Sequence, residues 1–185
     1  MVKPRIKLAG GRLLDPHNGV DEMLDVYVAE GRVVAVGAMP DGFSAEIELD
    51  VTGLCVIPGL VDLCARLREP GEEFKATIDS ECRAAAAAGI TTLCCPPDTS
   101  PVIDTPAVIE MILHRAQRVG ATRVVGLGAL TRDLDGEHLS EMHALKQAGC
   151  IGVSNARTPL ASTLIQRRAF EYAATFDLTV FLHAN

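Results

Sequence analysis

From residue 60 onward, short apolar runs alternate with longer amphipathic stretches. The apolar runs cover residues 60–63, 90–95, 124–130, 150–153 and 179–182. They have the length of buried strands. The stretches between them are predicted to be helical, near 74–88, 106–119, 137–148 and 160–175. Strands that alternate with helices predict a parallel sheet with right-handed crossovers, and a spacing of about 26 to 34 residues between strand starts suits a (β/α) barrel.

Individual residues mark several element ends. Thr105 followed by Pro106 predicts a helix start, with a capping hydroxyl and then proline at the first helical position. Gly120 and Gly149 stand where helix C-caps are expected. The sequence 126–128, Gly-Leu-Gly, lies inside an apolar run, and no third glycine opens a helix after it. We therefore interpret this pair of glycines as packing positions and not as a dinucleotide site.

The first part of the chain has a different pattern. Residues 5 to about 50 carry short alternating runs, and 23–28 and 32–36 flank Glu30-Gly31, which is typical of a hairpin turn. We predict the N-terminal part of a small β domain over residues 1–57 and the N-terminal part of a (β/α) barrel over residues 58–185.

The strand count does not complete a barrel. Five strands are predicted, whereas a closed (β/α)8 barrel has eight. The sequence stops at residue 185, directly after the fifth predicted strand, and an open parallel edge there would expose unpaired backbone groups. We expect a truncated chain, which is either the N-terminal part of a longer protein or a chain completed by another one.

Composition narrows the classes of function. Hydrophobic residues make up 48% of the chain and charged residues 22%, which indicates a folded protein. The net charge of −7 argues against nucleic acid or an anionic membrane surface as partner. Aromatic residues are only 4%, and tryptophan is absent, which argues against a base-stacking platform. The N-terminus lacks the apolar core of a signal peptide, and we expect a cytoplasmic protein.

The sequence has six cysteines and no CxxC pair: Cys55, Cys64, Cys82, Cys94, Cys95 and Cys150. Their neighbours are mostly apolar, and a free buried thiol packs as a small hydrophobic group. We predict six reduced packing residues in a reducing compartment. For Cys64 a second interpretation is a reactive thiol, because the nearby charge of Arg66 would stabilise a thiolate.

Several short motifs resemble those of one family. They are Pro-Gly-Leu-Val-Asp at 58–62, Leu-Arg-Glu-Pro-Gly at 67–71 and Pro-Val-Ile-Asp-Thr-Pro at 101–106. With these motifs the chain resembles the dihydroorotases of the amidohydrolase superfamily over essentially its whole length. The resemblance implies an α/β fold, a partial (β/α)8 amidohydrolase-type barrel with about five of eight strands, preceded by a small β-sandwich unit. Such enzymes hydrolyse the cyclic amide of dihydroorotate with one or two zinc ions at the C-terminal mouth of the barrel.

The metal ligands that the resemblance implies are mostly replaced. The family pattern on the first strand is His-x-His-x-Arg, and this chain has Cys64, Arg66 and Arg68, which would share one face of a strand. A thiolate can bind zinc, but a guanidinium has no lone pair to donate. The fourth-strand ligand position falls at Asn155 or Ala156, so its carboxylate is missing.

His183 matches the fifth-strand histidine and is the one retained ligand, which we interpret as a remnant or a packed histidine. We therefore predict vestigial metal positions at Cys64, Arg66, Asn155 and His183, no catalytic residue and no cofactor. Zinc would be expected only if the chain were a divergent hydrolase.

Two residues correspond to the substrate contacts of the family. Arg68 matches the arginine that grips the substrate carboxylate, and Asp98 replaces an asparagine. We treat both as remnants of the substrate site. Arg68 has an alternative role as the ion-pair partner of Glu69 or Asp62. Because Arg66 adds a cation and Asp98 an anion at neighbouring strand ends, we expect these two to pair within about 4–6 Å.

Two further stretches, 93–97 and 170–180, resemble a particular branch, the noncatalytic dihydroorotase-like chains of bacteria. Members of that branch assemble with aspartate transcarbamoylase and support it without hydrolysing dihydroorotate. The resemblance implies a structural role in pyrimidine biosynthesis with the aspartate transcarbamoylase catalytic chain as partner, and it leaves a homo-oligomer open. The alternative is a divergent metal-dependent cyclic amidohydrolase of dihydroorotase, hydantoinase or allantoinase type. The charge of Arg66 discriminates between the two.

Overall fold

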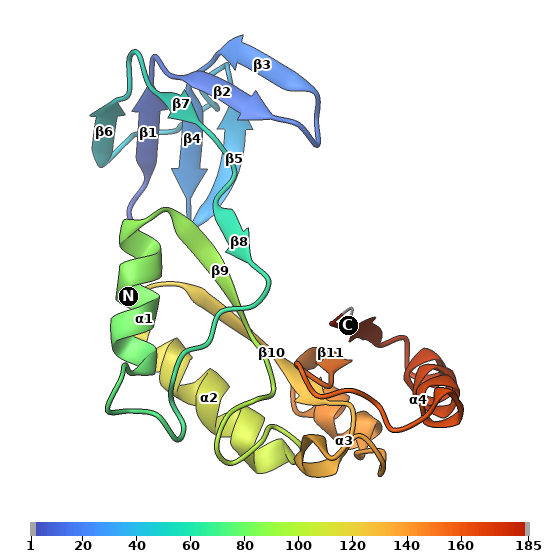
Figure 1. Ribbon diagram of the computed structural model, residues 1–185. Helices are drawn as coiled ribbons and strands as arrows, with labels where there is room; N and C mark the ends of the chain where they lie inside the picture. The colour runs from blue at the N-terminus through green and yellow to red at the C-terminus, as the bar shows by residue number, and fades with distance from the viewer. Residues whose placement is uncertain (1–2, 184–185) are drawn as a thin grey trace. The chain divides into compact units, whose positions relative to one another are not determined.

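A computed structural model describes residues 3–183 of the chain. The chain divides into two compact units, the first ending at Pro58 and the second beginning at Gly59 (Figure 1). No helix in the described part of the chain is long and apolar enough to cross a membrane.

The first unit consists of two small sheets. One has the strand order β5-β4-β1-β6 and the other β3-β2-β7. The bounds are β1 Ile6–Ala9, β2 Arg12–Asp15, β3 Val20–Met23, β4 Val26–Ala29, β5 Arg32–Val36, β6 Ile47–Asp50 and β7 Cys55–Val56. The predicted hairpin is confirmed: Glu30 and Gly31 join β4 to β5 with φ of 54° and 75°, the left-handed pair that a tight hairpin turn requires.

One face of the four-stranded sheet is apolar across its strands. Ile6 of β1 pairs with Val28 of β4 on one side and with Ile47 of β6 on the other. These paired positions share a face because side chains alternate along a strand. Ile47 remains 40% exposed and Leu49 of the same strand 47%. Within the described part of the first unit, this apolar face is therefore only half covered.

The second unit is an α/β half-barrel. Its curled parallel sheet has the order β12-β11-β10-β9-β8, so each strand pairs with its neighbour in sequence. The strands are β8 Leu60–Asp62, β9 Ile90–Cys95, β10 Arg123–Ala129, β11 Cys150–Ser154 and β12 Thr179–Phe181. The helices are α1 Ile78–Ala87, α2 Pro106–Val119, α3 Met142–Gln147 and α4 Thr163–Thr175, with a 3-10 turn η1 at Arg132–Leu134. All five predicted strands and the parallel order are confirmed.

Helix boundaries follow the capping chemistry only in part. Pro106 is the first residue of α2, and Gly120 ends the helix with φ of 65°, as predicted. The predicted side-chain cap is wrong, because the Thr105 side chain makes no capping hydrogen bond. The third helix was predicted over 137–148 but begins only at Met142. Residues 137–141 belong instead to a loop in which Ser140 Oγ donates to the Ala129 carbonyl.

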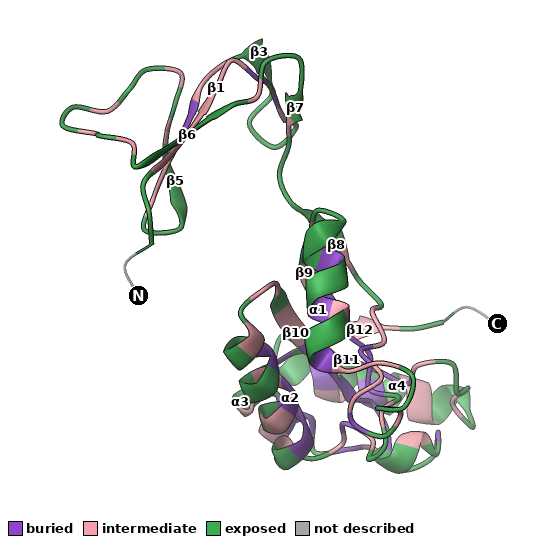
Figure 2. Ribbon diagram, turned by 90° about the vertical axis from the view of Figure 1, so that its left-hand side faces the viewer, coloured by how far each residue is buried: buried purple, intermediate pink, exposed green. Residues whose placement is uncertain are grey.

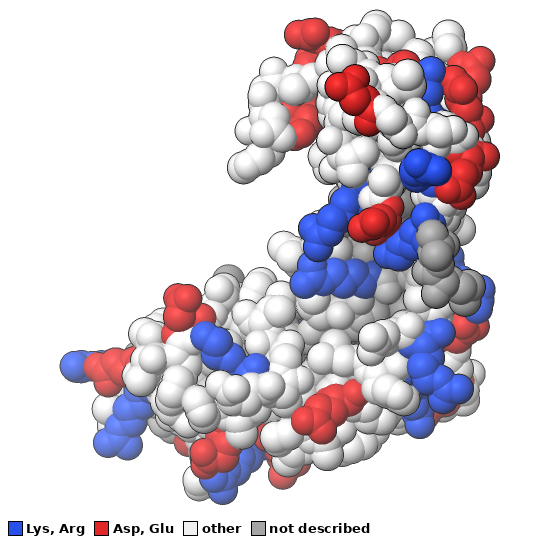
Figure 3. Space-filling model, turned by 180° about the vertical axis from the view of Figure 1, so that it is seen from behind, with Lys and Arg blue, Asp and Glu red and all other residues white. Residues whose placement is uncertain are grey.

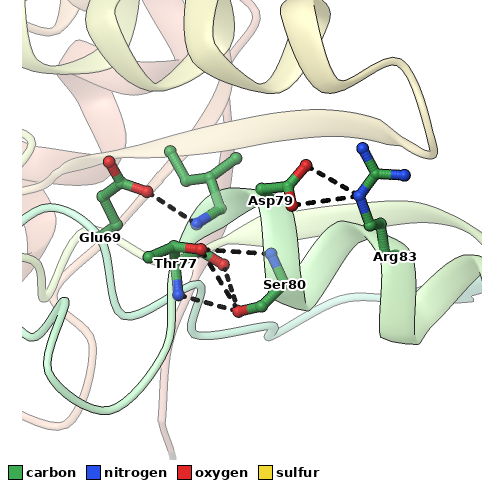
Figure 4. A network of polar contacts seen from close by, with 6 residues as sticks. Glu69, Thr77, Asp79, Ser80 and Arg83 are labelled. Atoms are coloured by element: carbon green, nitrogen blue, oxygen red, sulfur yellow. Dashed lines mark hydrogen bonds and ion pairs between the residues drawn. The ribbon is translucent and has the colours of Figure 1, made fainter.

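Helix α1 starts later than predicted, because a cap fixes its first turn. Thr77 Oγ1 accepts a hydrogen bond from Ser80 N, and Ser80 Oγ accepts one from Thr77 N (Figure 4). The Glu69 carboxylate accepts the Ile78 N–H at 2.8 Å and also pairs with Arg115 of α2. A carboxylate is favourable at a helix N-terminus because of the helix dipole. Glu69 thus ties the loop after β8 to two helices.

The core of the second unit lies between the sheet and the helices. Figure 2 shows buried residues concentrated in the strands and on the helix faces that meet them. One cluster joins Ile78 and Cys82 of α1 to Ile109 and Ile112 of α2. A second joins Val153 of β11 to Ala169 and Ala173 of α4. Burial of the apolar helix faces against the sheet therefore stabilises the half-barrel.

The cysteines divide into two groups. Cys82, Cys94, Cys95 and Cys150 are buried, as predicted, and burial raises the pKa of Cys95 and of Cys150 to about 12. The prediction is wrong for Cys55 and Cys64, which are exposed. All six are free thiols.

Charged side chains on the surface are mixed in sign. Figure 3 shows Lys and Arg next to Asp and Glu over much of the face that it presents. Within helices, Arg83 pairs with Asp79 at 2.9 Å and Arg167 with Glu171 at 2.8 Å. Exposed pairs of this kind contribute at most about 1 kcal/mol each.

The packing role predicted for Gly126 gives a stability test. A Cβ at this position would come 2.2 Å from Ile109 Cδ1, while the next nearest atom, Ile109 Cγ1, is 3.4 Å away. Because Ile109 is fully buried, we expect Gly126→Ala to lower the free energy of unfolding by about 1–3 kcal/mol. Ile109→Val removes the obstructing Cδ1, and alone it should cost about 0.5–1.5 kcal/mol.

The double variant should be more stable than the sum of the two single effects predicts, as measured by chemical denaturation. Strictly additive losses would show that Ile109 does not set the need for glycine.

Candidate functional site

Parallel pairing places the carboxyl ends of all five strands at one edge of the sheet. The segments that follow β8, β9, β11 and β12 line a cavity of about 320 Å³ at this edge, here called the mouth cavity. Its lining residues are Leu63, Cys64, Arg66, Pro96, Leu127, Ser154, Ala156, Arg157, Phe181, Leu182 and His183. Three of the four predicted vestigial positions, Cys64, Arg66 and His183, therefore lie together.

Arg66 forms the central ion pair of the site. Its Nη2 lies 2.8 Å from Asp98 Oδ2, and its Nε donates to the same oxygen at 2.9 Å. The pair that the sequence predicted is thus confirmed. Both side chains are about three-quarters buried, with 26% and 27% exposed. The hydrogen bond to Asp98 raises the pKa of the Arg66 guanidinium above its usual range, so Arg66 stays charged.

Cys64 stands directly beside this ion pair. Arg66 Nη1 lies 3.8 Å from Cys64 Sγ, within the range of a hydrogen bond to sulfur. The backbone N–H of Cys64 donates to Asp62 Oδ1 at 2.8 Å, which fixes the turn that follows β8. The sequence placed residues 64, 66 and 68 on one face of a strand. That placement is wrong, because β8 ends at Asp62 and these residues lie in the loop after it.

Arg68 is separated from the mouth cavity by the course of the loop. Its backbone is left-handed, with φ of 64°, and its side chain lines a neighbouring cavity of about 340 Å³ together with Asp98 and Glu72. Arg68 Nη1 pairs with Glu72 Oε2 at 2.7 Å. Neither of the partners proposed from the sequence, Glu69 and Asp62, is the residue with which it pairs.

The sequence suggested that Asn155 faces the barrel mouth, but its side chain does not line the mouth cavity. It is 2% exposed, and its Oδ1 accepts the Thr131 N–H and the Thr131 hydroxyl, at 3.2 and 2.7 Å. Its Nδ2 donates to the Thr158 carbonyl at 3.1 Å. Asn155 therefore ties the end of β11 to the loop after β10. Its neighbours Ser154 and Ala156 are the residues that line the cavity.

Sequence reasoning missed one charged residue of the site. Arg157 lines the mouth cavity three residues after β11 ends. Its position just past the carboxyl end of a predicted strand was the available signal. Ala156 before it has a left-handed backbone, with φ of 49°, and the turn that this produces could not be read from an alanine in the sequence.

Comparison with known proteins places the chain in a family. A family model described as "Dihydro-orotase-like" matches residues 53–185. The chain belongs to the dihydroorotase-like family. It is 53% identical over 175 residues to a "Dihydroorotase-like protein" of Pseudomonas aeruginosa, covering 95% of this chain and 41% of that protein. It is 43% identical over 181 residues to a "Dihydroorotase" of Syntrophotalea carbinolica, covering 98% of this chain and 42% of the relative.

The chain therefore spans about two fifths of the length of these relatives. Among solved structures, the L-hydantoinase (dihydropyrimidinase) of Arthrobacter aurescens superposes with a TM-score of 0.77 at 24% identity, over 100% of this chain and 41% of that one. A D-aminoacylase superposes with a TM-score of 0.70 at 21% identity, over 98% of this chain and 45% of the other. The partial amidohydrolase-type barrel predicted from the sequence is confirmed.

The side chains that residues 3–183 bring to the mouth cavity do not make up a site for a catalytic zinc ion. Such an ion takes three protein ligands and keeps one position open. The mouth cavity presents two groups able to ligate, Cys64 and His183, and it lacks a lining carboxylate among the described residues. Arg66 adds a fixed positive charge beside Cys64. Within residues 3–183, no group of three or more His, Cys, Asp or Glu side chains is placed to hold a metal ion.

The structural role of Asn155 predicts a loss of stability when its amide is removed. Asn155→Ala would leave the buried Thr131 N–H without its acceptor and the Thr158 carbonyl without its donor. We expect the free energy of unfolding to fall by about 2–3 kcal/mol in urea denaturation, because unpaired buried polar groups are costly. Gln117→Ala, an exposed position on α2, serves as the control and should change stability by less than about 0.5 kcal/mol. If Asn155→Ala and Gln117→Ala changed stability equally, the structural role assigned to Asn155 would be wrong.

The Arg66–Asp98 pair can be measured by a double-mutant cycle with Arg66→Met and Asp98→Asn. Because both side chains are mostly buried, we expect a coupling free energy of about 1 kcal/mol, at the upper end for ion pairs near a surface. The Arg83–Asp79 pair, with 66% and 53% of its side chains exposed, is the control and should give about 0.3–0.5 kcal/mol. A coupling at Arg66–Asp98 no larger than the control would contradict the central place given to this pair.

Proposed function

We propose that this chain is a noncatalytic dihydroorotase-like protein that acts in the cytoplasm as a structural partner of the aspartate transcarbamoylase catalytic chain in pyrimidine biosynthesis. The observation that carries the proposal is the position of Arg66. The Arg66 guanidinium is held by Asp98 and lies beside Cys64. It supplies a positive charge where this family of hydrolases would bind a cation. The Arg66 side chain cannot ligate a metal in any protonation state available in water.

The names of the relatives support the same proposal. Relatives with 53% and 48% identity, from Pseudomonas aeruginosa and Pseudomonas putida, are named dihydroorotase-like protein. A relative with 43% identity is named dihydroorotase. A half-barrel whose core lies between helices and sheet keeps its fold without its site, because fold and site are separable. The outer helical surface is then free to serve assembly.

A second candidate function has one observation in its favour. Cys64 and His183 line the same cavity, and both are residue types that bind zinc. A divergent cyclic amidohydrolase would use these two with further ligands from outside the described residues. The Arg66 charge weighs against this candidate.

Size-exclusion chromatography with light scattering tests the proposal. We expect the natural chain and the matching aspartate transcarbamoylase to form a stoichiometric complex that survives removal of metal by a chelator. The Arg66→Met variant should assemble equally well, because assembly is assigned to the outer surface and not to the cavity. A chain that stays separate at micromolar concentration would refute the partnership.

Hydrolysis of dihydroorotate, assayed with added zinc, gives the complementary result. We expect no turnover above background, while a relative named dihydroorotase verifies the assay. Zinc-dependent turnover that is lost in Cys64→Ala would instead establish the divergent hydrolase.

A further inference from the structure

We propose that Cys64 and Cys94 form a peroxide-sensitive thiol pair, in which the exposed Cys64 is oxidised first and the buried Cys94 then closes a disulfide with it. This modification site joins the loop after β8 to strand β9. The inference goes beyond the structural partnership, and it does not depend on whether aspartate transcarbamoylase binds.

The backbone brings Cys64 and Cys94 next to each other. Strand β8 pairs with β9 in parallel up to Asp62, which lies opposite Leu93. Past the end of β8, the Ala65 N–H donates to the Cys94 carbonyl at 2.9 Å, so the loop still follows β9 where it carries Cys64. Neighbouring strands lie about 4.8 Å apart, and a disulfide joins Cα atoms that are about 4.4–6.8 Å apart. The loop and the strand are therefore at a separation that a disulfide can span.

The Cys94 side chain lies on the face of the sheet that leads to the mouth cavity. Cys94 of β9 pairs with Val125 of β10, and side chains alternate along a strand. Leu127, two residues further along β10, therefore shares the face of Val125, and Leu127 lines the mouth cavity. Cys64 lines the same cavity. The Cys64 and Cys94 side chains are thus on one side of the sheet.

The same alternation excludes Cys95 as the second thiol. Leu93 and Cys95, on either side of Cys94, belong to the core cluster between the sheet and the helices. The Cys95 thiol donates to the Pro96 carbonyl at 3.5 Å. A bond from Cys64 to Cys95 would have to pass through the sheet.

The two thiols differ in their access to solvent, and this difference sets the order of the reaction. Cys64 is exposed, whereas Cys94 is 0% exposed. A dissolved oxidant therefore reaches Cys64 and not Cys94. Burial, followed by the charges of Cys64 and Asp62, raises the pKa of the Cys94 thiol to about 11. The contribution of Cys64 agrees with the short separation that the backbone indicates.

The reaction consumes one peroxide and forms one disulfide. Hydrogen peroxide transfers one oxygen atom to the Cys64 sulfur, which gives a sulfenic acid and releases one water. The Cys94 sulfur then attacks the Cys64 sulfur, the S–O bond breaks, and the hydroxyl leaves with the Cys94 proton as a second water. Both sulfurs are oxidised, and the peroxide is reduced to two waters. A thiol reductant reverses the disulfide, as is usual for redox-sensing disulfides of cytosolic proteins.

Oxidation of the full natural chain with an equimolar amount of hydrogen peroxide tests the proposal. The remaining thiols are blocked with N-ethylmaleimide in denaturant, and linked peptides are identified by mass spectrometry. We expect a Cys64–Cys94 disulfide that dithiothreitol reverses. Cys55, also exposed but in the first unit, is the internal control and should form no link within the chain. If Cys64 advanced to sulfinic acid without a disulfide, or linked to another cysteine, the proposal would be overturned.

Single variants assign a role to each thiol. Cys94→Ala should leave Cys64 as a sulfenic acid that dimedone traps, because the second thiol is missing. Cys95→Ala is the matched control at the neighbouring buried position, and it should form the disulfide as the natural chain does. Equal trapping by dimedone in the natural chain and in Cys94→Ala would overturn the proposal.

Cys64→Ala tests the order of the reaction without a change in the core, because Cys64 is exposed. We expect Cys94 to keep its thiol in this variant at the peroxide concentration that oxidises the natural chain. Oxidation of Cys94 at the same rate with and without Cys64 would show that Cys94 reacts on its own, and the proposed pair would be wrong.

Discussion

Everything at the mouth of the half-barrel depends on the parallel pairing of its five strands. Because β8 to β12 run in the same direction and in sequence order, their carboxyl ends meet at one edge. Residues as far apart in sequence as Cys64 and His183 then line one cavity. In such sheets the ligand sites lie at this edge. The pairing fixes where a site can be, and the residue types decide what it binds.

The Arg66–Asp98 pair shows how the residue types at such an edge can change while the edge stays. A charge that is three-quarters buried needs a partner, and Asp98, on the loop after β9, provides one at 2.8 Å. Introducing Arg66 alone would leave an uncompensated cation near Cys64. Arg66 and Asp98 therefore depend on each other, because each neutralises a charge that would otherwise be buried without a partner. The pairing also removes one carboxylate from those that could attract a cation.

The sequence predicts the presence of strands and helices better than it predicts their boundaries. It predicts the side-chain contacts least well. The spacing of apolar residues and the length of the apolar runs were sufficient to predict all five strands of the half-barrel. They were also sufficient for α2, whose bounds Pro106–Val119 coincide with the prediction. The early start predicted for α3 was wrong, because Ser140 and the loop around it form hydrogen bonds that a local pattern does not reveal. The Arg66–Asp98 pair was predictable because two neighbouring strand ends each carried an unexpected charge. The Arg68–Glu72 pair and the inward turn of Asn155 were not, since both depend on left-handed or irregular backbone between strands.

The two loops that carry Arg66, Arg68 and Asp98 are anchored by buried apolar side chains more than by the ion pairs of these three residues. Leu67, between Arg66 and Arg68, is 1% exposed and belongs to the main core cluster. Ile103, in the loop that carries Asp98, is fully buried in the same cluster. Burying a leucine or isoleucine stabilises a fold by about 1.5–3 kcal/mol, more than an ion pair near the surface provides. The positions of Arg66, Arg68 and Asp98 are thus set by their apolar neighbours, so the polar side chains can be exchanged while the loops stay in place. That separation allows the mouth of this dihydroorotase-like scaffold to present an arginine pair, Arg66 and Arg157, without any change in the course of its loops.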